Sequence, residues 1–143
     1  MNFTKATKQE QIEHKWHLVD VKDKILGRIA TDIALKLMGK NKLYFVRNMD
    51  CGDYVVVINI KDIKVTGKKL TQKIYTNYSG YPAGLRSEAL KDLLNRKPEE
   101  VMYRAVAGML PKNKLRNDLL KRLYLFAGAE HKYQEKFDNK KQK

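Results

Sequence analysis

Basic and aromatic residues lie close together in the middle of this 143-residue sequence, and their chemistry suits binding to a phosphate backbone. The lysines of this run are Lys61, Lys64, Lys68, Lys69 and Lys73, and the aromatic residues that follow are Tyr75 and Tyr78. Lysine ammonium groups bind phosphates, and aromatic rings stack on unpaired bases. The run therefore predicts contact with RNA. We expect both tyrosines on one side of a strand over residues 73–78, either facing RNA or buried beneath a helix.

Two further basic runs are predicted to bind RNA, and Arg86 is added to them as a single contact. One run contains Lys40, Lys42 and Arg47, and the other contains Lys112, Asn113, Lys114 and Arg116. A charge run is often only a solvated surface. Three runs in predicted loops of one strongly basic chain favour binding instead.

The overall charge indicates an acidic partner. Thirty Lys and Arg residues against sixteen Asp and Glu residues leave a net charge of +14, and both halves of the chain contribute to the excess. Nucleic acid is the commonest such partner, because each neutralised phosphate releases a condensed counterion. A membrane surface is the alternative. No run approaches the ~18 apolar residues of a membrane span, and the first residues lack the apolar core of a signal peptide.

Catalytic chemistry has one candidate site. Asp50 and Asp53 flank Gly52, and paired carboxylates can bind the divalent metal of a nuclease. The same residue types are preferred in a plain turn. The single cysteine, Cys51, permits no internal disulfide and fits a reducing cytosol. We predict no catalytic residues, metal, cofactor or small-molecule substrate. A metal-dependent nuclease and a DNA-compacting protein remain as alternatives.

Two Gly-Lys pairs resemble the end of a phosphate-binding loop. They are Gly39-Lys40 and Gly67-Lys68, but the glycine required five positions earlier is replaced by Ala34 and Asp62. We interpret the first pair as a helix cap and the second as a turn.

A strand–helix–strand unit is expected to position these residues. Residues 16–21 alternate as a strand, and residues 25–38 carry apolar side chains at helical spacing, with Asp20 or Asp23 as a possible cap. Residues 54–60 form an unbroken apolar run typical of a strand covered on both faces. The unit predicts an α/β fold with a parallel sheet.

Shorter elements complete the expected chain. They are strands at 63–66, 73–78 and 124–127, a loop at 79–84, a helix capped by Ser87, and helices at 98–110 and 115–123. Residues 1–15 are expected to form a flexible polar arm, and residues 132–143 a basic tail.

Ordered motifs from Trp16 to about His131 resemble the universal large-subunit ribosomal protein thirteen family in its bacterial form. The matching blocks are Trp16, Val19-Asp20-Val21, Leu26-Gly27-Arg28-Ile29-Ala30, Gly39-Lys40, Gly52-Asp53-Tyr54-Val55-Val56-Val57-Ile58-Asn59, Thr66-Gly67-Lys68-Lys69, Lys73-Ile74-Tyr75 and Ala105-Val106-Ala107-Gly108-Met109-Leu110-Pro111-Lys112-Asn113. The chain departs from the family at Val46-Arg47-Asn48, where a proline is usual, and at His131-Lys132-Tyr133-Gln134, where a His-Pro-His-like segment is usual.

The resemblance implies a single three-layer α/β/α domain over residues 16–131, around a small, mainly parallel sheet. It also implies binding to large-subunit ribosomal RNA early in assembly, contacts with neighbouring ribosomal proteins, a cytoplasmic location and no catalysis.

Overall fold

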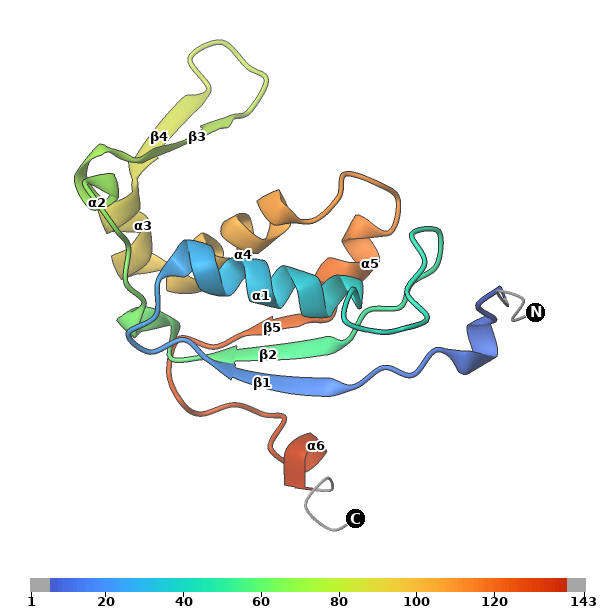
Figure 1. Ribbon diagram of the computed structural model, residues 1–143. Coiled ribbons are helices and arrows are strands. Elements are labelled where there is room, and N and C mark those ends of the chain that lie inside the picture. The colour runs from blue at the N-terminus through green and yellow to red at the C-terminus, as the bar shows by residue number, and fades with distance from the viewer. Residues whose placement is uncertain (1–5, 139–143) are drawn as a thin grey trace.

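A three-stranded parallel sheet forms the centre of the computed structural model, which describes residues 6–138 (Figure 1). The strand order is β1 (Trp16–Asp20), β2 (Tyr54–Ile58), β5 (Leu123–Leu125). In the register, Trp16 lies beside Tyr54 and Val55 lies beside Leu123. The side chains of the three valines of β2 are fully buried, which confirms the prediction of a strand covered on both faces.

Two long helices cover one face of the sheet. Helix α1 (Leu26–Met38) and helix α4 (Pro98–Met109) pack against each other above the strands (Figure 1). Ile33 and Leu37 of α1 are fully buried in one core with Val55 of β2 and Val106 of α4. The predicted α/β fold and its strand–helix–strand unit are therefore confirmed.

The predicted ends of α1 are half right. Gly39 ends the helix in the left-handed conformation, with φ of 75°, as expected. The prediction that Asp20 or Asp23 caps its start is wrong, because the cap position is Ile25 and no side chain caps the helix. The Leu26 amide instead donates to the Lys64 carbonyl, so a neighbouring loop replaces the missing cap.

The opposite face of the sheet carries a thin aromatic layer. Trp16 stacks on Tyr54 with ring centroids 4.5 Å apart, and Tyr124 extends the stack. The carboxyl-terminal segment with helix α6 (Glu135–Asp138) covers these rings, because Tyr133 lies 4.4 Å from Tyr124 and Phe137 meets Trp16 edge-on. The start of the segment expected as a tail is thus part of the folded body. The rest of that tail, residues 139–143, lies outside the described residues.

The arm is likewise held at its inner end. The Lys15 amide donates to Asp53, and His14 contacts the Gly52 carbonyl. A short 3₁₀ helix, η1 (Gln9–Gln11), precedes these contacts. Residues 1–5 lie outside the described residues.

A separate antiparallel hairpin projects from the body (Figure 1). It consists of β3 (Ile74–Tyr78) and β4 (Leu85–Ala89). The prediction that Ser87 caps a helix is wrong, since Ser87 pairs with Thr76 in the hairpin and helix α3 (Leu90–Arg96) begins afterwards. Cross-strand pairing with a preceding segment outweighed the local preference of serine for a cap.

The remaining elements are short. They are η2 (Ile60–Asp62), α2 (Lys69–Gln72) and α5 (Arg116–Leu120). The predicted strand at 63–66 is reduced to one bridge between Ile25 and Lys64. The helix predicted to reach residue 123 ends at Leu120, because Leu123 begins β5.

Candidate nucleic-acid interface

The central lysines lie at one end of the molecule, between β2 and the hairpin. We name Lys61, Lys64, Lys68, Lys69 and Lys73 the hairpin-base cluster. All five side chains are exposed. Lys64 forms an ion pair of 2.8 Å with Asp23, and within residues 6–138 the other four have no acidic partner. The parallel strands end at this side of the sheet, where α/β proteins commonly bind ligands.

The two hairpin tyrosines lie in different environments. The expectation that both face one side is wrong, because residues three apart on a strand point to opposite faces. The Tyr75 ring is half-buried, with Lys73 Nζ 5.3 Å and Arg104 Cζ 5.1 Å from its centroid. Burial raises the pKa of the Tyr75 hydroxyl, and the Arg104 charge opposes that shift only in part. Tyr78 is 64% exposed on the other face.

Arg86 shares the polar face of the hairpin. It lies opposite Asn77 in the register, on the face that carries Tyr75 and Glu88. Arg86 is exposed and has no ion-pair partner in the described chain, whereas Glu88 is bonded to Arg96 at 2.6 Å. Arg86 is therefore free to contact a phosphate beside the hairpin-base cluster.

The other two predicted runs converge at the opposite end of α1. Lys40, Arg47 and Asn113 line one pocket of about 260 Å³ between the ends of α1 and α4 and the start of α5. Lys112 and Lys114 are exposed beside Asn113. We name these five residues the helix-end cluster. Their convergence arises from packing, since about seventy residues separate the two runs in sequence.

Two residues of these runs bond inward. The Lys42 ammonium forms an ion pair of 2.5 Å with Asp53 and donates to the Cys51 carbonyl at 2.8 Å, and its side chain is only 10% exposed. Arg116 donates to the Ala107 carbonyl at 2.7 Å and is half-buried. The Lys42 and Arg116 side chains are therefore less accessible to RNA than the other predicted contacts, because each is bonded to acceptors within the protein.

The Asp50–Asp53 turn is a hub of internal bonds. The Gly52 amide donates to Asp50 at 3.2 Å. This bond is typical of a turn, the alternative to a metal site at these residues. Asp50 pairs with Arg122, and Asp53 accepts from His17 at 2.8 Å and from the Lys15 amide at 2.9 Å. Among residues 6–138, no group of three or more His, Cys, Asp or Glu side chains is arranged to hold a metal ion.

Burial and bonding oppose each other at Asp53. Burial alone would raise the pKa of its carboxyl group. The bonds from the Lys15 amide, Lys42 and His17 outweigh burial and hold the pKa below its ordinary value of 3.8. Asp53 is therefore an ionised, internally neutralised group that ties β1 and the 42–53 loop to the start of β2.

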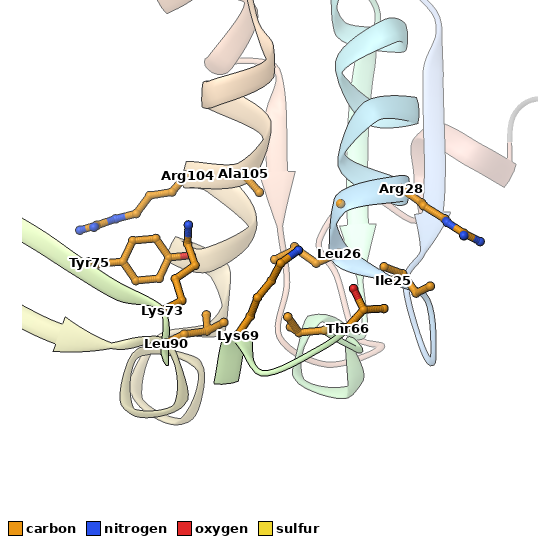
Figure 2. Close-up of a pocket in the computed structure, with 12 residues that line it drawn as sticks. Ile25, Leu26, Arg28, Thr66, Lys69, Lys73, Tyr75, Leu90, Arg104 and Ala105 are labelled. Carbon is orange, nitrogen blue, oxygen red and sulfur yellow. The ribbon is translucent and has the colours of Figure 1, made fainter. Parts of the chain in front are cut away.

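Sequence reasoning missed a cleft beside the hairpin-base cluster. It is lined by Arg104 of α4 together with Lys69, Lys73 and Tyr75, and Arg28 of α1 borders it with its guanidinium directed away (Figure 2). Each arginine stands apart from the basic runs, so neither formed a visible cluster. The spacing of Arg28 on the polar side of a helix was the only available signal.

Comparison with known proteins adds a family to this geometry. The sequence model described as ribosomal protein L13 matches residues 14–132, which is most of the chain. The chain belongs to the ribosomal protein L13 family. The resemblance found in its motifs is thereby confirmed, and the matched region includes the sheet, the hairpin and both basic clusters.

Relatives at about half identity support the same assignment. "Large ribosomal subunit protein uL13" of Nitratidesulfovibrio vulgaris is 54% identical over 122 residues, covering 85% of each chain. The proteins of the same name from Lawsonia intracellularis and Clostridioides difficile are 52% and 51% identical, and cover 91% and 87% of this chain and 90% and 87% of their own lengths. These names describe ribosomal proteins and not enzymes. No helix within residues 6–138 is long and apolar enough to cross a membrane.

Proposed function

We propose that this protein is a structural constituent of the large subunit of the cytoplasmic ribosome, where it binds large-subunit ribosomal RNA and assists early assembly. Its family and the names of its relatives support the ribosomal assignment. The observation that carries RNA binding is the pair of exposed basic clusters at opposite ends of α1. Neighbouring ribosomal proteins are the other expected partners, and the proposal needs no membrane or small-molecule substrate.

The two clusters suggest how the protein acts. Phosphate contacts position a protein on RNA but carry little sequence information. Specificity then comes from RNA shape and from unpaired bases. A folded core that holds two cationic surfaces apart can contact two RNA segments at once. Neutralising their phosphates lowers the repulsion between the segments, which favours their approach during assembly.

The test is binding of the full protein to transcribed fragments of large-subunit ribosomal RNA, with transfer RNA and duplex DNA as competitors, over a salt series. We expect one fragment to bind about a thousandfold more tightly than the competitors, since specific binding usually exceeds non-specific binding by about 10³ or more. Equal, salt-sensitive binding to all three would contradict the proposal and favour a DNA-compacting role. Cleavage of RNA that needs a divalent ion and Asp53 would favour a nuclease.

A matched pair of variants locates the interface. Changing Lys68, Lys69 and Lys73 to Gln removes three unpaired charges of the hairpin-base cluster. The control changes Lys91, Lys132 and Lys136 to Gln, which are exposed lysines outside both clusters, so both variants have the same net charge. The first should lower the slope of log affinity against log salt by about 2 to 3, at ~0.7 to 0.9 per phosphate contact. Equal slopes for the two variants would contradict the assignment of this cluster.

A further inference from the structure

A cleft of about 420 Å³ lies between the start of α1, the segment before the hairpin, and α4 (Figure 2). Its lining includes Leu26, Gly27, Thr66, Lys69, Tyr75 and Ala105. Cavities of this size typically hold small organic groups. The cleft joins the hairpin-base cluster, so a ligand bound to those lysines has direct access to it.

The lining separates into an apolar floor and a cationic mouth. Leu26 and Ala105 supply accessible apolar surface above the almost fully buried Leu90. Lys69 and Lys73 extend into the space above it, whereas Arg28 points away on the far side of α1 (Figure 2). The Arg104 guanidinium is bonded to Glu100 at 2.5 Å, so it is partly neutralised. The free positive charge of the cleft therefore belongs to the two lysines.

The Tyr75 hydroxyl adds a polar group inside the cleft. A tyrosine hydroxyl of ordinary pKa 10.0 is already protonated at neutral pH, and burial raises this pKa further, so the group can donate a hydrogen bond. It has no hydrogen-bond partner within the described residues. An apolar floor with one hydroxyl directed into the cleft suits a flat aromatic ligand with polar groups at its edge. A phosphate alone would contact neither the floor nor the hydroxyl.

Gly27 is a glycine that the protein itself does not require. It lies in the first turn of α1, it is exposed, and a Cβ added there would meet nothing within 4 Å. Its φ is outside the left-handed region, so the backbone does not demand glycine. Glycine destabilises a helix relative to alanine, and close approach of a ligand to the backbone is one reason to keep it. The Gly27 and Arg28 amides also have no backbone acceptor in the described chain.

We propose that this cleft receives one unpaired nucleotide of the bound RNA. The base lies on the floor of Leu26 and Ala105, within reach of the Tyr75 hydroxyl. The phosphate lies at the mouth, between Lys69, Lys73 and the exposed backbone at Gly27. The proposal rests on the proposed RNA-binding function and adds to it a site that reads an extruded base. The same chemistry would accept a free mononucleotide, so the experiment has two arms.

The first arm titrates the full protein with adenosine, guanosine, cytidine and uridine monophosphates, and with inorganic phosphate at matched ionic strength. Amide chemical shifts of Gly27, Arg28 and Thr66 are followed by NMR. We expect saturable shifts with at least one nucleotide, at an affinity about tenfold or more above that of phosphate, because stacking adds to charge. Equal affinity for phosphate would reduce the cleft to an anion site. If none of the four nucleotides produced saturable chemical-shift changes, the proposal would be overturned.

The second arm blocks the cleft in the RNA complex. Gly27→Leu fills the mouth, and its matched control, Gly108→Leu, changes another exposed helical glycine with open space around it. Leucine favours helix over glycine, so both variants should fold, which circular dichroism checks. We expect about tenfold weaker binding of the RNA fragment for Gly27→Leu and no change for the control. Chemical probing of the RNA fragment should show one nucleotide whose reactivity changes when wild-type protein binds but not when Gly27→Leu binds.

The outcomes distinguish the two proposals. Wild-type protein that prefers no ribosomal RNA fragment contradicts the proposed function, and the mononucleotide titration still decides what the cleft binds. Wild-type protein that binds a fragment specifically, together with Gly27→Leu that binds equally well and gives the same probing pattern, overturns the cleft proposal alone.

Discussion

Replacing Gly52 with alanine should destabilise the fold strongly, because this residue lies in backbone contact with the end of α1. A Cβ at position 52 would lie 1.8 Å from the Leu37 carbonyl oxygen and 3.0 Å from a methyl group of Leu119. A carbon–oxygen contact is normally about 3.3 Å or more, so the loop and the helix must separate by roughly 1.5 Å.

The loop cannot move without breaking its bonds. Asp50 and Asp53 on either side of Gly52 are paired with Arg122 and Lys42. Overpacking costs about 1–3 kcal/mol and the loss of a buried ion pair about 3–5 kcal/mol. Partial loss of both suggests that Gly52→Ala lowers the free energy of unfolding by ~2–5 kcal/mol, out of a typical total of ~5–15 kcal/mol.

The assay is urea unfolding followed by the fluorescence of the single tryptophan, Trp16, which stacks on Tyr54. Gly27→Ala is the control, since its Cβ meets nothing and alanine favours helix, so it should stabilise the protein by about 0.5–1 kcal/mol. A Gly52→Ala protein as stable as wild type would refute the reasoning, because it would mean that the loop and α1 separate freely.

Three further predictions address the internal bonds. The lowered pKa of Asp53 stabilises the fold fully above its ordinary value of 3.8, and this contribution is lost as pH falls toward the folded pKa. The difference in unfolding free energy between wild type and Asp53→Asn should therefore narrow between neutral pH and about pH 3, and a constant difference would contradict the shift. Lys42→Gln should lower the free energy of unfolding, measured by urea unfolding, by about 3 kcal/mol and leave the salt dependence of RNA binding unchanged. Unchanged stability with a weaker salt dependence would instead place the Lys42 ammonium on the RNA. Tyr133→Ala should cost about 1–2 kcal/mol and shift the Trp16 emission to longer wavelength, and an unchanged spectrum would argue that the terminal segment does not cover the sheet.

Local patterns predicted the elements that local forces determine. The apolar spacing of residues 25–38 and the valine run of β2 each identify one element without reference to distant residues. The strand around Ser87 could not be found this way, because β4 has neither alternating apolar residues nor β-branched ones and exists through its pairing with β3.

The candidate site shows the same division. The runs of lysine are visible in sequence, and most of these side chains are exposed. The inward role of Lys42 is set by Asp53, eleven positions away along the chain but adjacent in the fold. Arg122 bonds to a turn whose Gly52 is 70 positions away. The cleft beside Tyr75 likewise depends on packing between α1 and α4, which no local pattern reports.

The order in which the ribosome makes this chain has a consequence for when it can fold. Strand β5 begins at Leu123, and the rings that cover the second face of the sheet come later still, at Tyr133 and Phe137. A growing chain can form the first strand–helix–strand unit early, but the sheet face that carries Trp16 stays open until Tyr133 and Phe137 have emerged. The basic clusters, which precede residue 117, are therefore synthesised before the rings that complete the second face of the sheet. Until then the partly folded chain exposes an aromatic surface that favours aggregation, a hazard that ends when the segment with Tyr133 and Phe137 closes over Trp16.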